Sequence, residues 1–443
     1  MIFKRIKYQL LMCLCIGNSW MFGQASYDYT QLKLSDAIEI GLQNNKKLKV
    51  QNFKTNLSVL NELDLKNEKL PEIDFHTGFH VLTNLRQYDN GFLHPSTKHE
   101  TPRIKYDFSL SAEIPVYLGG KLKLDEEKAA IETEIQKLKF KREEREVRMQ
   151  IITSYLQVLH LQEQQKLITD KMREDSAIID QTIKLEKNGV VTHNEVLRTK
   201  LQLSNHQMSF SELENEIAIL EHRIKTILSV PEVQDFHIDT SDLFTSTDKM
   251  GVVDQLVLDA MDNSESLSIT KKDVELKVLD KKLTKSNVLP KITAGAEYTF
   301  SYPNMIFFPP VEHLYRVGLV GVNITMPITN FYKNKVKMQM AEKNISMARL
   351  QVEEKEEQLR HDVFSAHKKL EEAVDKIKIA EQAIEQAKEN YRIVKLKYIN
   401  KLSLITELID ADNAYLAAQS NLISLQINKQ LKYYQLQYVI GNL

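Results

Sequence analysis

The sequence predicts an α+β fold made of two tandem copies of one unit, each running helix, strand, strand, long helix, helix. Three observations lead to this prediction: a heptad pattern on one very long helix, four segments of strand-like alternation, and an internal repeat. The second copy follows the first at a nearly constant offset, so that Asn263 corresponds to Asn44 and Pro327 corresponds to Pro115. Only 13 glycines and 10 prolines occur in 443 residues, which favours long elements.

The long helix of the second copy is the clearest element. From Leu359 to Tyr398, apolar or aromatic residues recur at alternating steps of four and three, and mostly charged or amide side chains stand between them. A period of 3.5 residues predicts a left-handed coiled coil against a partner helix. No proline or glycine interrupts the chain between Asn334 and Tyr398. At 1.5 Å per residue this helix would be about 100 Å long, so it spans a distance.

Residues 1–24 have the pattern of a secretory signal peptide. Three basic residues precede the short apolar run 10–17, and the small residues Gly23 and Ala25 follow it. Both cysteines, Cys13 and Cys15, lie inside this segment, so the mature chain is expected to have no disulfide and no cysteine metal site. A lipid anchor on one of these cysteines is a weaker alternative, because neither follows a small residue.

Composition excludes some classes of partner. Charged residues make up 27% of the chain and the net charge is −1, so no large basic surface for nucleic acid is implied. No apolar run after residue 25 is long enough for a membrane-spanning helix.

Four segments alternate between apolar and polar residues over 9–11 positions, which is strand periodicity. Strands are expected at about 72–83 and 104–116 in the first copy and at about 291–301 and 315–326 in the second. The pattern fits a membrane barrel with an apolar outer face and a polar lumen. A half-buried sheet in a soluble sandwich remains the alternative. In the barrel, the lipid-facing residues would be Phe75, Phe79, Phe108 and Tyr298, and the lumen-facing residues would be Asp74, Asp107, Glu113 and Glu297.

The helices complete the two repeats, which are assigned to residues 25–229 and 251–443 with a linker at 230–250. Each leading helix should stop at a Leu-Pro pair, where proline cannot continue it. Asn188-Gly189 is a helix C-cap signal at the end of the first long helix. The predicted helices are about 35–70, 119–187 and 192–228 in the first repeat, and about 252–288, 331–398 and 403–439 in the second.

Four strands cannot close a barrel, and open sheet edges cannot sit in lipid. Several chains must therefore pool their strands, and three chains give twelve, an even number within the known range. The sequence thus predicts a trimeric 12-stranded β-barrel continued by an α-helical coiled-coil tube. The signal peptide and the amphipathic strands indicate the outer membrane of a Gram-negative bacterium, with the helices in the periplasm.

Several short motifs occur in the same order in both copies: Leu34–Ile38 with Asn44-Asn45 and Leu48, Leu70-Pro71 and Leu289-Pro290, Ile114-Pro115 and Met326-Pro327, and Gly189–Leu197 with the similar segment Tyr398–Ala411. By these motifs the chain resembles the TolC-like outer-membrane efflux proteins, over essentially all of its mature length. Two residues depart from the family pattern: Lys46 stands where proline often follows the Asn pair, and Lys401 stands at a turn glycine, which raises the question of whether this tip keeps its conformation.

The resemblance implies a homotrimeric duct that takes substrates from a periplasmic adaptor protein and an inner-membrane pump of the RND or ABC type, in efflux or type I secretion. It also implies a periplasmic gate at Glu407 and Asp410. The first copy has Glu195 but Arg198 at the matching positions. The alternative for the two acids is a solvated surface near a helix N-terminus, where the dipole favours negative charge. The helical tips expected to contact the adaptor comprise Gly189, Val190, Val191, Thr192, Lys401, Leu402 and Ser403.

No catalysis or cofactor is expected. The sequence contains no phosphate-binding loop, no ordered nucleophile–base set and no metal-ligand cluster. A competing hypothesis is a periplasmic coiled-coil scaffold without transport activity, which would suit the heptads and the signal peptide but leaves the four strands unexplained.

Overall fold

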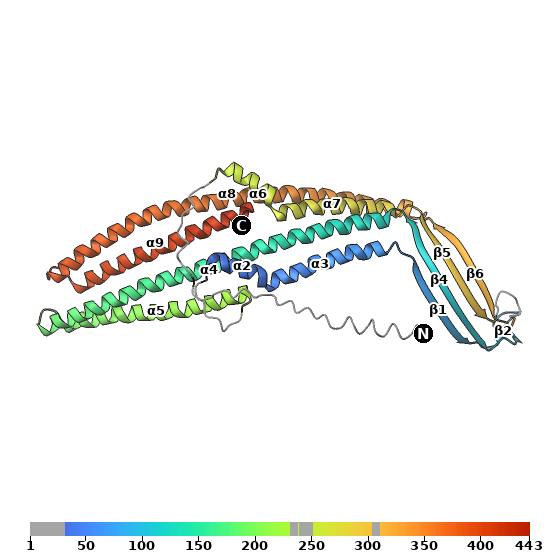
Figure 1. The fold of residues 1–443 in the computed structure, drawn as a ribbon, viewed down its shortest axis with the longest axis horizontal. Coiled ribbons are helices and arrows are strands. Elements are labelled where there is room, and N and C mark those ends of the chain that lie inside the picture. Colours follow the sequence, from blue (N-terminus) through green and yellow to red (C-terminus); the bar gives the residue numbers. More distant parts are fainter. Residues whose placement is uncertain (1–31, 231–237, 239–250, 304–310) are drawn as a thin grey trace, which may run out of the picture.

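The computed structural model describes residues 32–230, 238, 251–303 and 311–443, and they form a long molecule with a sheet at one end and helices along the rest (Figure 1). The expected signal peptide and nearly all of the expected linker lie outside the described residues. Within the described ranges, no helix is long and apolar enough to cross a membrane.

The two repeats have the predicted order of elements. The first comprises α2 (Leu34–Asn44), α3 (Lys46–Asn67), β1 (Glu72–Val81), β4 (Ile104–Leu118), α4 (Lys121–Lys187) and α5 (His193–Leu228). The second comprises α6 (Val253–Asn263), α7 (Glu265–Ser286), β5 (Lys291–Tyr302), β6 (Tyr315–Thr325), α8 (Asn330–Ile399) and α9 (Ile405–Ile440). A short hairpin of β2 (Leu85–Gln87) and β3 (Thr97–His99), which the sequence did not predict, lies in the loop between β1 and β4.

The prediction of one leading helix per repeat was wrong, because each is divided in two. At Asn45 the side chain accepts hydrogen bonds from the backbone N–H groups of Lys47 and Leu48 and so caps α3. Its amide also donates to the carbonyl of Ile227 at 2.9 Å, which ties the break to α5. In the second repeat Ser264 caps α7 in the same way. A capping side chain that satisfies the first free N–H groups starts a new helix at this point.

The four long strands form one antiparallel sheet in the order β1-β4-β5-β6. The second strand was predicted to end at about residue 116, but β4 continues through Pro115 to Leu118. Its register with β5 shifts between Pro115 and Tyr117, a bulge that accommodates a residue without an N–H. The pairing of β5 with β6 has no such shift and is continuous from Lys291 to Ser301.

Two glycines make the turn from the sheet into the first long helix. Gly119 and Gly120 have φ of 67° and 77°, a region that disfavours residues with a Cβ. A Cβ on Gly119 would also lie 2.9 Å from the carbonyl oxygen of Ser286. The turn therefore brings α4 directly beside the end of α7.

The helices next to the sheet repeat the order of the strands. α3, α4, α7 and α8 lie side by side, with α3 and α8 at the two edges. Farther from the sheet, α4 pairs with α5 and α8 pairs with α9 as two helical hairpins (Figure 1). The predicted seam of α8 is buried at most of its positions, including Leu359, Val363, Leu370 and Tyr398. The largest core lies between α2, α4 and α5, around the fully buried Tyr155, whose hydroxyl donates to the carbonyl of Leu32.

Candidate functional site

Both hairpins end in the same kind of turn. After α4, the N–H of Val190 donates to the carbonyl of Leu185 and Gly189 has φ of 71°. After α8, the N–H of Leu402 donates to the carbonyl of Lys397 and the preceding residue, Lys401, has φ of 64°. This hydrogen bond with a left-handed residue before it is the Schellman C-cap.

The tip of the second hairpin therefore keeps its conformation although it lacks the glycine. A lysine in the left-handed region costs about 1–2 kcal/mol relative to the right-handed one. The side chain of Lys401 is exposed, and so is Leu402 beside it, at 76%. Of the other predicted tip residues, Gly189 and Thr192 are exposed, and Val190, Val191 and Ser403 are half-buried.

The gate candidates lie on one exposed side of α9, just after this turn. Glu407 and Asp410 are both exposed and three residues apart, which places them on the same face of the helix. The hydroxyl of Ser403 donates to the Glu407 carboxylate. Among their immediate neighbours, Leu408 and Asp412 are buried, so α9 turns its other side toward the rest of the chain.

A cluster of charged and polar side chains, partly buried, connects this other side of α9 to the first hairpin. The Nζ of Lys171 on α4 lies 2.5 Å from Oδ1 of Asp412 and 2.9 Å from Oε2 of Glu174. From α8, the hydroxyl of Tyr391 and the Nζ of Lys395 donate to the other oxygen of Glu174, at 2.6 and 2.8 Å. These five residues, here called the inter-hairpin network, join α4, α8 and α9 within one chain.

Burial and hydrogen bonds within the inter-hairpin network shift the pKa values of its groups. Burial alone would raise the pKa of Glu174, but hydrogen bonds from Lys395, Tyr391 and Lys171 lower it to about 2. Glu174 therefore adds stability above its ordinary pKa of 4.5, and this contribution is lost as the pH falls toward 2. Burial raises the pKa of Asp412 despite the adjacent ammonium group. Burial also raises the pKa of Tyr391, which keeps its hydroxyl protonated as a donor.

Further contacts lie beside this network. Within the first hairpin, Nδ1 of the buried His206 on α5 lies 2.7 Å from the carboxylate of the buried Asp175 on α4. From the same face of α5, Gln202 donates to Asn413 on α9 at 2.6 Å. Nearer the tips, Tyr398 donates to Glu195 at 3.3 Å and so connects the end of α8 to the start of α5.

Sequence reasoning missed the inter-hairpin network. The buried positions of the first long helix include Lys171 and Asp175, two charged residues that no apolar pattern marks. The sequence of α9 does indicate a buried charge. Ile405, Leu408 and Asp412 are spaced three and four residues apart and so share one face of the helix, which is apolar except for Asp412. The partner of that charge could not be found, because it belongs to the other repeat.

Strands β1, β4 and β5 separate their polar and apolar residues as the alternation requires, whereas in β6 Leu319 lies opposite Glu297 on the polar face. The register puts Phe75 opposite Leu110, which is opposite Tyr298, so all three lie on one face. Asp74, Ser111 and Glu297 are aligned in the same way on the other face. By the same pairing, Phe79 and Phe108 lie with the first set, and Asp107 and Glu113 lie with the second.

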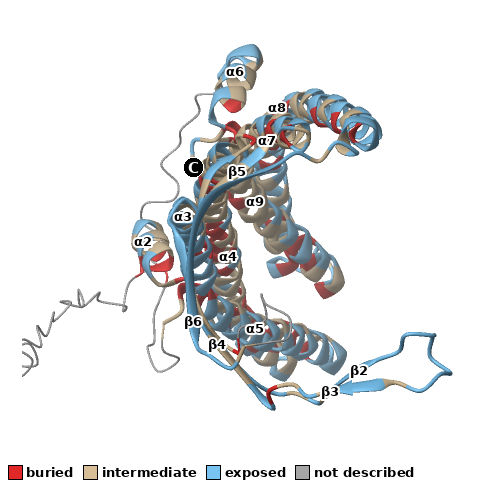
Figure 2. Ribbon diagram, turned by 90° about the vertical axis from the view of Figure 1, so that its right-hand side faces the viewer, coloured by how far each residue is buried: buried red, intermediate tan, exposed pale blue. Residues whose placement is uncertain are grey.

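The polar face is the concave one. A hollow of about 460 Å³ lies on it, lined by residues that include Asp74, Glu113, Glu297 and Asn323. Figure 2, along the long axis, shows the sheet as a curved wall. In the described part of the chain, no three His, Cys, Asp or Glu side chains are grouped so that they could hold a metal ion.

We predict that Lys171→Met loosens α9 from α4, because it leaves the buried Asp412 without its cation. Removing one partner of a buried ion pair costs about 3–5 kcal/mol. Amide hydrogen exchange in α9 should therefore accelerate, while the core around Tyr155 stays protected. The control is Lys166→Met, which removes an exposed pair with Glu163 and should cost no more than about 1 kcal/mol. Equal exchange in the two variants would show that the network does not hold the hairpins together.

Comparison with known proteins agrees with this architecture. The chain is similar in structure to the outer-membrane channel OprN, with a TM-score of 0.76 at 15% identity over 93% of this chain and 90% of that one. It is also similar to VceC of Vibrio cholerae, with a TM-score of 0.73 at 14% identity over 92% and 96% of the two chains.

The open-state MtrE channel of Neisseria gonorrhoeae gives a TM-score of 0.73 at 15% identity over 92% and 88% of the two chains. No curated protein sequence matches the chain significantly. The model of the family described as outer membrane efflux protein matches residues 42–229 and 256–442, nearly the whole of both repeats. The chain therefore belongs to the outer membrane efflux protein family, whose members form trimeric channels.

Proposed function

We propose that this protein is the outer-membrane duct of a tripartite efflux or type I secretion system. It passively carries substrates from a periplasmic adaptor and an inner-membrane pump to the outside. The observation that carries the proposal is the sheet, which has an apolar face and a concave polar face and two unpaired edge strands. Such a sheet suits one third of a water-filled barrel, and a scaffold without transport would have no use for it.

The helix edges support closure by copies of the same chain. The exposed edge of α3 carries Val50, Phe53, Leu57, Leu60 and Asp64 at heptad spacing. The exposed edge of α8 carries the matching series Lys333, Val336, Met340, Lys343, Met347 and Leu350. Two such stripes form a coiled-coil seam when they meet. Because they stand on opposite edges of one protomer, their contact is head-to-tail and closes into a ring.

The two stripes also lie at matching distances from the sheet. α3 ends at Asn67 on the sheet side and α8 begins there at Asn330. By helical rise, Leu57 on α3 and Met340 on α8 both lie about 15 Å from these sheet-side ends. Asp64 and Lys333 both lie in the helical turn next to the sheet, so opposite charges meet across the proposed seam. This match supports a homotrimer.

We predict that Phe108→Arg impairs insertion into outer membranes much more than Ser109→Arg. In the proposed barrel Phe108 faces lipid, where a charge costs about 2–4 kcal/mol at mid-membrane, and Ser109 faces water. The amount of heat-modifiable trimer in outer-membrane fractions measures the effect. Equal tolerance of the two substitutions would contradict the proposed faces, and release of the unchanged protein in soluble form would favour the scaffold.

The exposed turns at the far end of the tube are the surfaces available to an adaptor. The second tip presents Leu402 and Leu404, exposed at 76% and 67%, and apolar groups exposed at this level suit a protein contact. We predict that a cysteine at Leu402 or Val191 cross-links to the adaptor, while a cysteine at the exposed Lys368, near the middle of α8, does not. Absence of any adduct from both tips would refute the contact.

The exposed pair of carboxylates on α9 supports a gate. In a trimer, Glu407 and Asp410 would form two rings of three carboxylates near the axis, and the inter-hairpin network would fix the orientation of α9. Such rings attract cations.

We predict that the double variant Glu407→Gln, Asp410→Asn changes conductance in planar bilayers and weakens block by multivalent cations. Glu195→Gln is the matched control, since it removes the corresponding acid of the first hairpin. If the double variant conducts and is blocked like the wild type, the two acids are a solvated helix surface.

A further inference from the structure

The groove between α7 and α8 changes its charge where it reaches the sheet. Away from the sheet it is bridged by ion pairs, Lys271 with Glu356 at 3.3 Å and Lys281 with Glu342 at 2.9 Å. Lys285 lies two heptads after Lys271, and Lys335 lies one heptad before Glu342, so both continue the same stripes toward the sheet. There, both stripes carry lysine where a lysine–glutamate pair would be expected, and the hydrogen bond from Asn334 to the carbonyl of Thr284 places the two lysines at the same level.

The segments on either side of this groove end contain no acidic residue. Residues 281–291 have four lysines and residues 325–341 have three, and neither stretch has Asp or Glu. The lysines Lys282, Lys285 and Lys335 are exposed, and within the described residues no carboxylate lies within 4 Å of any of them. The groove end is therefore a concentration of uncompensated positive charge.

The first repeat provides an internal comparison. The corresponding segments, 62–72 and 113–129, hold eight acids and five lysines. Four of these lysines have carboxylate partners: Lys66 with Glu62, Lys69 with Glu126, Lys123 with Glu127 and Lys128 with Asp280. The charge is thus a property of the second repeat alone and not of every junction between helix and strand.

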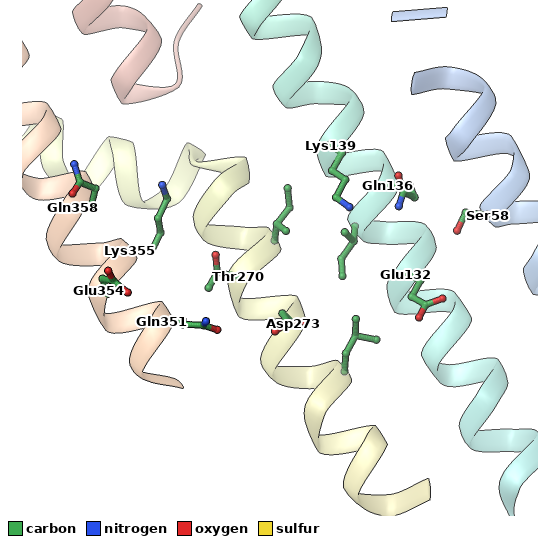
Figure 3. Close-up of a pocket in the computed structure, with 13 residues that line it drawn as sticks. Ser58, Glu132, Gln136, Lys139, Thr270, Asp273, Gln351, Glu354, Lys355 and Gln358 are labelled. Atoms are coloured by element: carbon green, nitrogen blue, oxygen red, sulfur yellow. The ribbon is translucent and has the colours of Figure 1, made fainter. Parts of the chain in front are cut away.

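This groove end faces neither the neighbouring protomer nor the lumen. The stripe proposed to meet α3 of the next protomer contains Lys333 and Val336 but not Lys335. The concave side of the helical layer is marked by a hollow of about 760 Å³, lined on α8 by Gln351, Glu354, Lys355 and Gln358 and on α7 by Thr270 and Asp273 (Figure 3). Continued toward the sheet in steps of seven residues, those positions reach residues such as Lys337 and Thr284, and none of them reaches Lys282, Lys285 or Lys335.

The groove end lies at the distance from the strands at which a lipid headgroup layer is expected. β5 begins at Lys291 and β6 ends at Thr325, so the lysines of α8 lie within about 20 Å of the strand ends by helical rise and linker length. Three apolar or aromatic residues at the same level are exposed: Ile328 at 73%, Phe331 at 58% and Tyr332 at 67%. Aromatic side chains with adjacent lysines are typical of a membrane–water interface.

We infer that the sheet end of the α7–α8 groove binds the headgroup of an acidic phospholipid of the periplasmic leaflet, one site in each protomer. The inference rests on the proposed location in the outer membrane. The phosphate supplies the negative charge that the groove lacks, and Ile328 and Phe331 lie beside the start of the acyl chains. Each lysine near an anionic membrane surface raises affinity roughly fivefold at moderate salt.

The test compares lipid binding to purified trimers in a neutral detergent. Phosphatidylglycerol and phosphatidylcholine are titrated in parallel, and bound lipid is counted by native mass spectrometry while the thermal transition is followed. The variant is Lys282→Gln, Lys285→Gln, Lys335→Gln. The control is Lys66→Gln, Lys69→Gln, Lys123→Gln, which makes the same change of charge at the same height in the first repeat.

The wild type and the control should prefer phosphatidylglycerol, and the groove variant should bind it at least about tenfold more weakly. No preference in the wild type, or equal loss in both variants, would overturn the site. Loss of the trimer in the groove variant alone would also overturn it, because the lysines would then serve a protein contact. Bilayer conductance of the wild type is measured separately, so a failure of the proposed channel is distinguishable from a failure of the lipid site.

Discussion

The structure depends on the hydrogen-bonding groups along the outer edges of β1 and β6. In water these groups would be solvated, but in hydrocarbon each unpaired group costs several kcal/mol. A four-stranded sheet is too narrow to pair its own edges, so the edges must be paired by copies of the same chain. The helices follow from this requirement, since α3 and α8 stand below the edge strands and carry the apolar stripes that a neighbouring copy would cover.

At the other end of the molecule, charged residues replace apolar packing. Near the tips Lys171, Glu174 and Asp412 join the two hairpins, whereas farther along α9 Ile427 packs into the apolar core around Tyr155. Buried ion pairs add little net stability compared with apolar residues, but they fix which groups lie opposite each other. The direction in which α9 presents Glu407 and Asp410 is therefore set by a specific pairing rather than by the general tendency of apolar surfaces to associate.

The repeated order of elements could be predicted because it depends on local patterns. The alternation in β1 and β5 and the heptads of α8 follow from periods of two and 3.5 residues, and the duplication made each pattern visible twice. The breaks at Asn45 and Ser264 were missed because an Asn or Ser within a helical pattern becomes a cap only when tertiary contacts favour it, as the bond from Asn45 to Ile227 does. The partnership of Lys171 with Asp412 was missed for a different reason: a contact between the two repeats leaves no periodic trace in the sequence.

The unequal lengths of the helices have a mechanical consequence. α4 and α8 run without interruption for 67 and 70 residues from the sheet to the tips, so each behaves as a stiff shaft. The same distance beside each shaft is covered by two shorter segments, α3 with α5 and α7 with α9, which are separate helices. A twist applied at a tip therefore acts on the sheet mainly through the two shafts, because the shorter segments meet through contacts such as the 2.9 Å hydrogen bond from Asn45 to Ile227 and not through continuous helical backbone.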